Sequence, residues 1–201
     1  MCIRDRYALA DAGIEEPDLD KLEPFIGPPL TDSFREFYGF DDEQIKRAID
    51  KYHERFDEKG IFENEIIEGI PELLKALKDA GRRVSIASSK PRPLVIRILE
   101  HFEIAQYFDT VVGSEFDGRF ATKEAVVEEA LKQLVPSVYE KEDVAMVGDR
   151  KFDIQGARAH GLTGIGVSFG YAGEHELEDA GADYIVDTVE ELQRLLLQGS
   201  L

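Results

Sequence analysis

Two aspartates lie four residues apart just after a short apolar run in the C-terminal half of the chain. The run is Val-Ala-Met-Val at 144–147, Gly148 and Asp149 follow it, and a helical pattern begins at once. These residues predict a buried parallel strand with Asp149 at its carboxyl end. If the helix has started by Asp149, Asp153 lies on the same face of its first turn. Two such carboxylates suit Mg²⁺, which takes a few carboxylates, waters and a substrate phosphate. The spacing alone fits an aspartate N-cap followed by a solvated acid equally well.

Three earlier polar residues occupy positions where a phosphate group could be held. Ser88 follows the apolar strand at 84–87 and offers a hydroxyl and backbone N–H groups to an anion, although alone it fits an N-cap for the helix after Pro91. Lys123 lies at the start of a helix, where the helix dipole disfavours a positive charge. Contact with a phosphate group would explain a lysine at this position, but the commoner alternative is an exposed surface lysine. Lys90 competes for the same role. A hydroxyl, an ammonium and a metal-binding acid are groups that phosphoryl transfer requires.

Around these residues the chain changes from an all-helical pattern to alternating strands and helices. From Tyr7 to about Ile66 the spacing is helical, interrupted at Gly27-Pro28-Pro29, which fits a plain helix breaker and, as an alternative, a substrate-facing loop. After Glu68 the alternation is typical of an α/β fold with a parallel sheet. We expect strands at 84–87, 110–113, 144–147, 164–168 and 184–186, and helices at 71–80, 94–102, 122–134, 154–160, 174–180 and 189–197.

The composition excludes several classes of protein. With 24 basic and 42 acidic residues the net charge is −18, which disfavours nucleic acid as a partner, although a metal and a lysine can reverse the sign inside a cleft. The single cysteine, Cys2, rules out an internal disulfide and favours a reducing cytoplasm. No apolar run approaches the roughly 20 residues that span a bilayer. We expect a cytoplasmic monomer or homodimer with a small phosphorylated substrate.

Taken together, the motifs resemble those of the haloacid dehalogenase-like hydrolases, specifically the phosphoglycolate phosphatase-like branch with a helical cap and its 5′-nucleotidase relatives. The matching segments are Ala87-Ser88-Ser89-Lys90-Pro91, Asp117-Gly118 through Lys123, Val147 to Ala157, and Ala182-Asp183-Tyr184-Ile185. The resemblance implies a Rossmann-like parallel sheet with helices on both faces at 67–201 and a small all-helical cap domain at 1–66. Residues 1–6 fit an artefactual or disordered leader.

The resemblance also assigns roles to individual residues. It implies that Ser88, with Ser89, binds the phosphoryl group and that Lys123 neutralises this group and the nucleophile. Asp149 would ligate Mg²⁺ and Asp153 would support that site, while Gly27–Pro29 would lie in a cap loop that closes over the substrate. The implied activity is a Mg²⁺-dependent phosphatase of small phosphomonoesters, of the phosphoglycolate or 5′-nucleotide type, that works through an aspartyl-phosphate intermediate.

One part of the family's pattern is missing. Members open with an apolar strand ending in Asp-x-Asp-Gly-Thr, whose first aspartate attacks phosphorus and whose second is the general acid and base. The only Asp-x-Asp here, Asp18-Leu19-Asp20, follows Glu15-Glu16-Pro17 rather than a strand and lacks the glycine, so we reject it as the nucleophile. The first core strand is therefore expected to be absent, which would leave two inner sheet edges open. We expect an N-terminally truncated chain, inactive as written.

Two interpretations from other classes remain. The chain could be a pseudoenzyme that binds a phosphorylated ligand or partner without turning it over. A receiver-like signalling domain, with Asp149 as phosphate acceptor, is a weaker alternative, because the helical lobe and the spacing of Asp149 and Asp153 speak against it.

Overall fold

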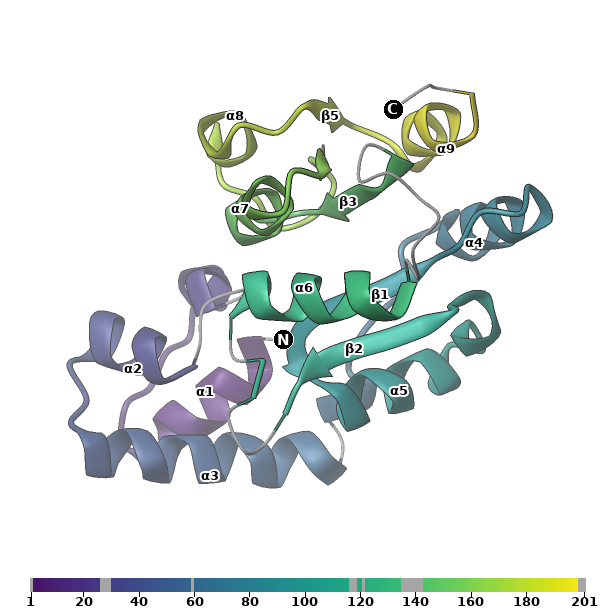
Figure 1. Cartoon of the computed structure of the whole chain (residues 1–201). Helices are drawn as coiled ribbons and strands as arrows, with labels where there is room; N and C mark the ends of the chain where they lie inside the picture. The colour runs from purple at the N-terminus through teal and green to yellow at the C-terminus, as the bar shows by residue number, and fades with distance from the viewer. Residues whose placement is uncertain are drawn as a thin grey trace. The chain divides into compact units, whose positions relative to one another are not determined.

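The computed structural model describes residues 2–25, 30–58, 60–115, 119–120, 122–134 and 143–198. The chain divides into two compact units, Met1–Glu65 and Ile66–Leu201. Figure 1 shows helices in the described part of the first unit and alternating strands and helices in the second. Within these described ranges, no helix is both long and apolar enough to cross a membrane.

The first unit is built from helices around a cluster of aromatic rings. Its elements are α1 (Cys2–Asp11), the 3₁₀ helix η1 (Asp20–Phe25), α2 (Leu30–Tyr38), α3 (Asp42–Glu58) and the 3₁₀ helix η2 (Gly60–Phe62). Phe34 is fully buried; its ring meets Phe25 edge-on at 5.2 Å and stacks on Phe40 at 5.6 Å. The helical pattern predicted here is confirmed for the described residues. The segment Gly27-Pro28-Pro29, predicted to be a helix breaker or a cap loop, lies outside them.

The second unit confirms the predicted α/β class, with element ends shifted by a few residues. Its elements in order are α4 (Ile70–Asp79), β1 (Ser85–Pro91), α5 (Arg92–His101), the 3₁₀ helix η3 (Ala105–Tyr107), β2 (Thr110–Ser114), α6 (Lys123–Leu134), β3 (Ala145–Gly148), α7 (Lys151–Ala159), β4 (Thr163–Val167), α8 (Glu176–Ala180), β5 (Tyr184–Val186) and α9 (Val189–Gln198).

The described strands form two parallel sheets rather than one. One sheet pairs β1 with β2, and the other has the order β3-β4-β5 (Figure 1). All of these pairings are parallel. Among the described strands, β1 and β3 thus have one neighbour each, and each keeps an edge whose N–H and C=O groups no described strand pairs. The two open edges expected from the sequence are confirmed in this part of the chain.

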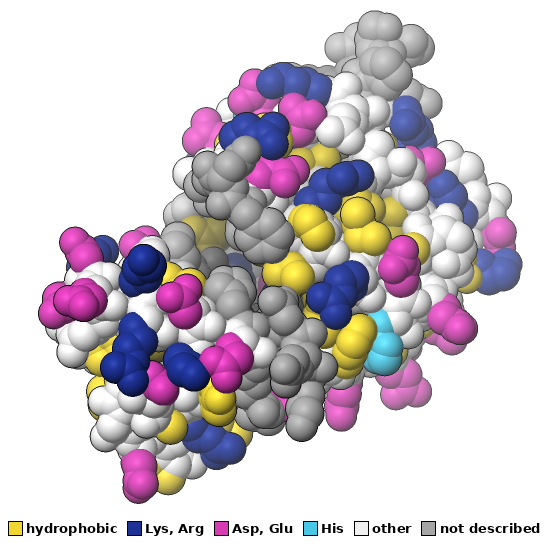
Figure 2. Space-filling view, turned by 90° about the horizontal axis from the view of Figure 1, so that it is seen from below, with side chains coloured by type: hydrophobic (Ala, Val, Ile, Leu, Met, Phe, Trp, Pro, Cys, Tyr) yellow, Lys and Arg dark blue, Asp and Glu magenta, His cyan; other side chains and the backbone are white. Residues whose placement is uncertain are grey.

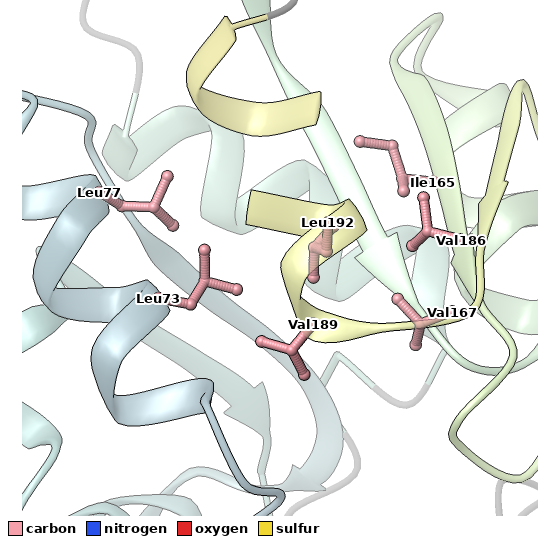
Figure 3. Packing of buried hydrophobic residues seen from close by; sticks show 7 residues of the cluster. All are labelled: Leu73, Leu77, Ile165, Val167, Val186, Val189 and Leu192. Atoms are coloured by element: carbon pink, nitrogen blue, oxygen red, sulfur yellow. The ribbon is translucent and has the colours of Figure 1, made fainter. Parts of the chain in front are cut away.

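Helices cover both faces of the three-stranded sheet. On one face, α4 and α9 pack against β4 and β5 (Figure 3), through a buried cluster of Leu73, Leu77, Ile165, Val167, Val186, Val189 and Leu192. On the other face, Val127 of α6 and Ala157 of α7 form a second cluster, against which Met146 of β3 and Ala87 of β1 also pack. This second cluster brings β1 and β3 to the same pair of helices.

Candidate functional site

Lys123 is the residue that connects the separate motifs. It is the first residue of α6, immediately after Thr122, whose hydroxyl accepts a hydrogen bond from the backbone N–H of Ala125 at 3.2 Å. The Lys123 Nζ donates to the carbonyl oxygen of Ala87 in β1 at 2.9 Å and lies 2.9 Å from Asp153 Oδ1 in α7. Only 15% of its side chain is exposed, so the alternative of a surface lysine is wrong.

Asp153 faces inward and is occupied by protein donors. Its residue exposure is 7%, and while Oδ1 meets Lys123, Oδ2 accepts a hydrogen bond from the backbone N–H of Arg150 at 3.1 Å. The close fit depends on Gly148, because a Cβ at this position would overlap the Asp153 side chain. The structure therefore makes Asp153 the partner of Lys123, and the alternative of a solvated acid is wrong.

Asp149 lies in the short segment between β3 and α7. The helix α7 begins at Lys151 with Arg150 as its N-cap, so Asp149 is neither a cap nor part of the first turn. The condition under which Asp149 and Asp153 would share one helical face, a helix that has started by Asp149, is therefore not met. Asp149 Oδ2 accepts a hydrogen bond from the backbone N–H of Tyr171 at 3.0 Å, which ties it to the loop that follows β4.

Ser88 and Ser89 lie within β1 rather than after it. The sequence predicts that this strand ends at Ala87, but parallel pairing with β2 continues to Pro91 through an irregularity in the register after Ser88. Ser88 is half-buried, and its Oγ accepts a hydrogen bond from the backbone N–H of Lys90 at 3.1 Å. The N-cap of α5 is Pro91 without a side-chain hydrogen bond, so Ser88 does not cap that helix.

Two further residues, Arg150 and Glu176, fix the loop around Asp149. Arg150 Nε lies 2.9 Å from Glu176 Oε1, and the two side chains are 14% and 15% exposed. Burial alone would raise the pKa of Glu176, but the hydrogen bonds from Arg150 and from the backbone N–H groups of Lys151 and Gly173 outweigh it, and the net pKa is lowered. The sequence does not single out Glu176, because Glu174 and Glu178, two residues away on either side, are acidic residues in the same segment.

Among the residues that the structure describes, the site offers a cation one suitable carboxylate. Mg²⁺ commonly binds through one or two carboxylates and keeps several waters, and Asp149 at the mouth of β3 fits such a ligand. Both oxygens of Asp153 are used by Lys123 and Arg150, so Asp153 suits a supporting role. Within the described ranges, no group of three or more His, Cys, Asp or Glu side chains could hold a metal ion. Asp149 would have to be completed by waters, substrate or other residues.

The arrangement matches a known family along most of the chain. Residues 5–167 match the haloacid dehalogenase-like hydrolase family. The chain belongs to the haloacid dehalogenase-like hydrolases. The family resemblance found in the sequence is confirmed, and so is the expected enzyme class, a hydrolase of phosphoric monoesters.

Relatives of this haloacid dehalogenase-like chain include enzymes with different names. A 5′-nucleotidase from Pseudomonas aeruginosa is 42% identical over 173 residues, which are 86% of this chain and 76% of that protein. The tyrosine-protein kinase PtkA of Mycobacterium tuberculosis is 36% identical over 194 residues, but these amount to only 65% of that protein. The crystal structure of a predicted phosphatase from Clostridium acetobutylicum superposes on this chain with a TM-score of 0.90 and 43% sequence identity. The superposition covers 98% of this chain and 90% of that one.

Proposed function

We propose that the intact protein is a Mg²⁺-dependent phosphatase of small phosphomonoesters, of the phosphoglycolate or 5′-nucleotide type. The position of Lys123 carries this proposal. Its Nζ lies 2.9 Å from both the Ala87 carbonyl, next to Ser88, and the Asp153 carboxylate, four residues after Asp149. One buried ammonium thus stands between the segment suited to a phosphoryl group and the segment suited to a metal.

The residues of this chain would divide the work of holding the phosphoryl group. Ser88 Oγ accepts from the N–H of Lys90, which leaves its own hydroxyl proton available for a phosphoryl oxygen. The backbone N–H of Ser89 would add a second donor, and Lys123 would balance the negative charge. Asp149 would hold Mg²⁺, which when bound would neutralise further charge on the phosphoryl oxygens.

We infer that turnover needs an aspartate that these 201 residues do not supply. Asp18 lies between α1 and η1 and Asp20 is the first residue of η1, so neither lies at the end of a strand, and both Asp149 and Asp153 accept hydrogen bonds from the protein. In the proposed reaction an aspartate carboxylate attacks phosphorus, and the alcohol leaves with a proton from a second acid. Water then hydrolyses the aspartyl phosphate and releases inorganic phosphate. The open edges of β1 and β3 support a further parallel strand that would carry this aspartate.

The second candidate is a pseudoenzyme that binds a phosphorylated ligand or partner without hydrolysing it. The lack of a suitably placed Asp-x-Asp in the sequence favours this function. It predicts saturable binding of a phosphate ester, weakened by Lys123→Ala, with no Mg²⁺-dependent hydrolysis even by the complete gene product.

The coding sequence upstream of Tyr7 decides between the two candidates. We expect it to encode an apolar strand ending in Asp-x-Asp. A protein that includes this segment should release phosphate from phosphoglycolate, 5′-nucleotides or related esters only when Mg²⁺ is present, and the 201-residue chain should not. An upstream sequence without Asp-x-Asp, or a complete protein that binds these esters without hydrolysing them, would contradict the catalytic proposal.

We also infer a cytoplasmic monomer or homodimer that binds neither nucleic acid nor membranes. The single cysteine and the net charge of −18 support this inference. On the face drawn in Figure 2, the Lys and Arg side chains of the described residues are interspersed with Asp and Glu, which suits neither a nucleic acid backbone nor an anionic bilayer.

A further inference from the structure

Glu176 connects two loops that lie beside Asp149. Its carboxylate oxygen Oε1 accepts hydrogen bonds from Arg150 Nε at 2.9 Å and from the backbone N–H of Lys151 at 2.8 Å. Its other oxygen, Oε2, accepts a hydrogen bond from the backbone N–H of Gly173 at 3.2 Å. One carboxylate, 15% exposed, therefore holds both the segment after β3 and the segment after β4.

These bonds close a ring that includes the Asp149 side chain. The backbone N–H of Tyr171 donates to Asp149 Oδ2 at 3.0 Å. The backbone connects Asp149 to Lys151, which is hydrogen-bonded to Glu176. Glu176 is hydrogen-bonded to Gly173, and the backbone connects Gly173 to Tyr171, whose N–H closes the ring at Asp149. Because Glu176 holds Lys151 and Gly173, two residues after Asp149 and Tyr171, it keeps the Tyr171 N–H group in place to donate to the Asp149 carboxylate.

A simpler role for Glu176 is to cap the short turn that precedes α8. The backbone N–H of Glu176 donates to the Gly173 carbonyl at 3.1 Å, and this reciprocal pair resembles a capping box. Capping accounts for Oε2 alone. It does not explain why Oε1 accepts two donors from the segment that carries Asp149, one of them a charged guanidinium.

We propose that Glu176 is a positioning residue that fixes the orientation of the Asp149 carboxylate for its ligand. The bonds of the ring stand on the structure alone, whereas the identity of the ligand as Mg²⁺ rests on the proposed function. Residues that orient a metal ligand typically change metal affinity by about 10-fold to 100-fold when they are mutated.

The test compares Glu176→Gln with Glu174→Gln, a matched change at a side chain that is 91% exposed. The amide of Tyr171 is the reporter, because Glu176 does not bond to it directly, and the amide of Ile165 in buried β4 reports global unfolding. Hydrogen exchange followed by NMR should be about tenfold faster at Tyr171 in Glu176→Gln, beyond any change at Ile165, and unchanged in Glu174→Gln. A merely structural role would accelerate both amides equally.

Unchanged exchange at Tyr171, or equal acceleration at Ile165, would overturn the inference. If Glu176→Gln does not fold, Arg150→Met removes one of the three bonds to Glu176 and should still accelerate exchange at Tyr171 selectively. Titration with Mg²⁺ alone separates the two proposals. Selective acceleration at Tyr171 in Glu176→Gln, together with no Mg²⁺ binding by the wild-type chain, would support the positioning role of Glu176 and contradict the proposed metal.

Discussion

Replacing Lys123 by methionine should destabilise the second unit by about 3 kcal/mol. Removing one partner of a buried ion pair costs about 3–5 kcal/mol, because the other charge stays buried. The Lys123 and Asp153 side chains are 15% and 10% exposed, so solvent screens the pair little. The change also removes a cation from the start of α6, which returns up to about 1 kcal/mol. The expected net loss is therefore about 2–4 kcal/mol.

The assay is urea denaturation followed by far-ultraviolet circular dichroism, since the chain has no tryptophan. Lys132→Met is the matched control on the same helix. Lys132 pairs with Glu128 at 2.8 Å, but these side chains are 62% and 55% exposed, and so exposed an ion pair contributes little to stability. Adding Asp153→Asn to Lys123→Met should recover part of the loss, because the uncompensated carboxylate disappears.

A loss for Lys123→Met no larger than the loss for Lys132→Met would refute this reasoning. It would mean that the ammonium of Lys123 does not lie between Ala87 and Asp153 in solution. The contact that joins the motifs would then be absent.

Three further predictions concern the loops around Asp149. Gly170→Ala should lower the free energy of unfolding, measured by thermal denaturation, by about 1–3 kcal/mol, because a Cβ there would overlap Asp149. Gly173→Ala should lower it much less, because its Cβ would lie 3.7 Å from Glu176. Equal losses in the two variants would contradict the packing. Because the pKa of Glu176 is lowered, its carboxylate stabilises the fold at pH values above 4.5, the ordinary pKa of a glutamate, and this stabilisation is lost as the pH falls through the lowered pKa. Glu176→Gln should therefore lose less stability on acidification than the wild type. An unchanged pH profile of stability would contradict this. Added Mg²⁺ should raise the melting temperature of the wild type but not of Asp149→Asn, and an equal rise in both would exclude Asp149 as the ligand.

Much of the fold of the second unit is predictable from local sequence. The apolar runs at 110–113, 144–147 and 184–186 are strands because each is short and bounded by turn residues, although Tyr184 and Ile185 stay exposed. The strand β1 is the exception, since its pairing with β2 carries it through the polar residues Ser88 and Ser89 to Pro91. Polarity marks a loop in the sequence, and only the neighbouring strand shows that the backbone stays extended.

The candidate site is predictable as a set of residues but not as a set of contacts. Spacing identifies Asp149 and Asp153 as a pair, yet the start of α7 at Lys151 separates them, and Asp153 turns to Lys123 instead. Contacts of this kind join residues far apart in the chain, so no local pattern carries them. Glu176 shows the same limit, because its burial depends on Arg150, 26 residues earlier.

Turnover by a protein that includes the proposed upstream aspartate tests the central claim most directly. The account predicts Mg²⁺-dependent release of phosphate from para-nitrophenyl phosphate, with a kcat lowered about 100-fold to 1,000-fold by Lys123→Met, the usual cost of losing one charge-stabilising donor. Lys132→Met should leave the rate unchanged. Equal rates for the wild type and Lys123→Met would contradict the account, because the phosphoryl group would then be held elsewhere.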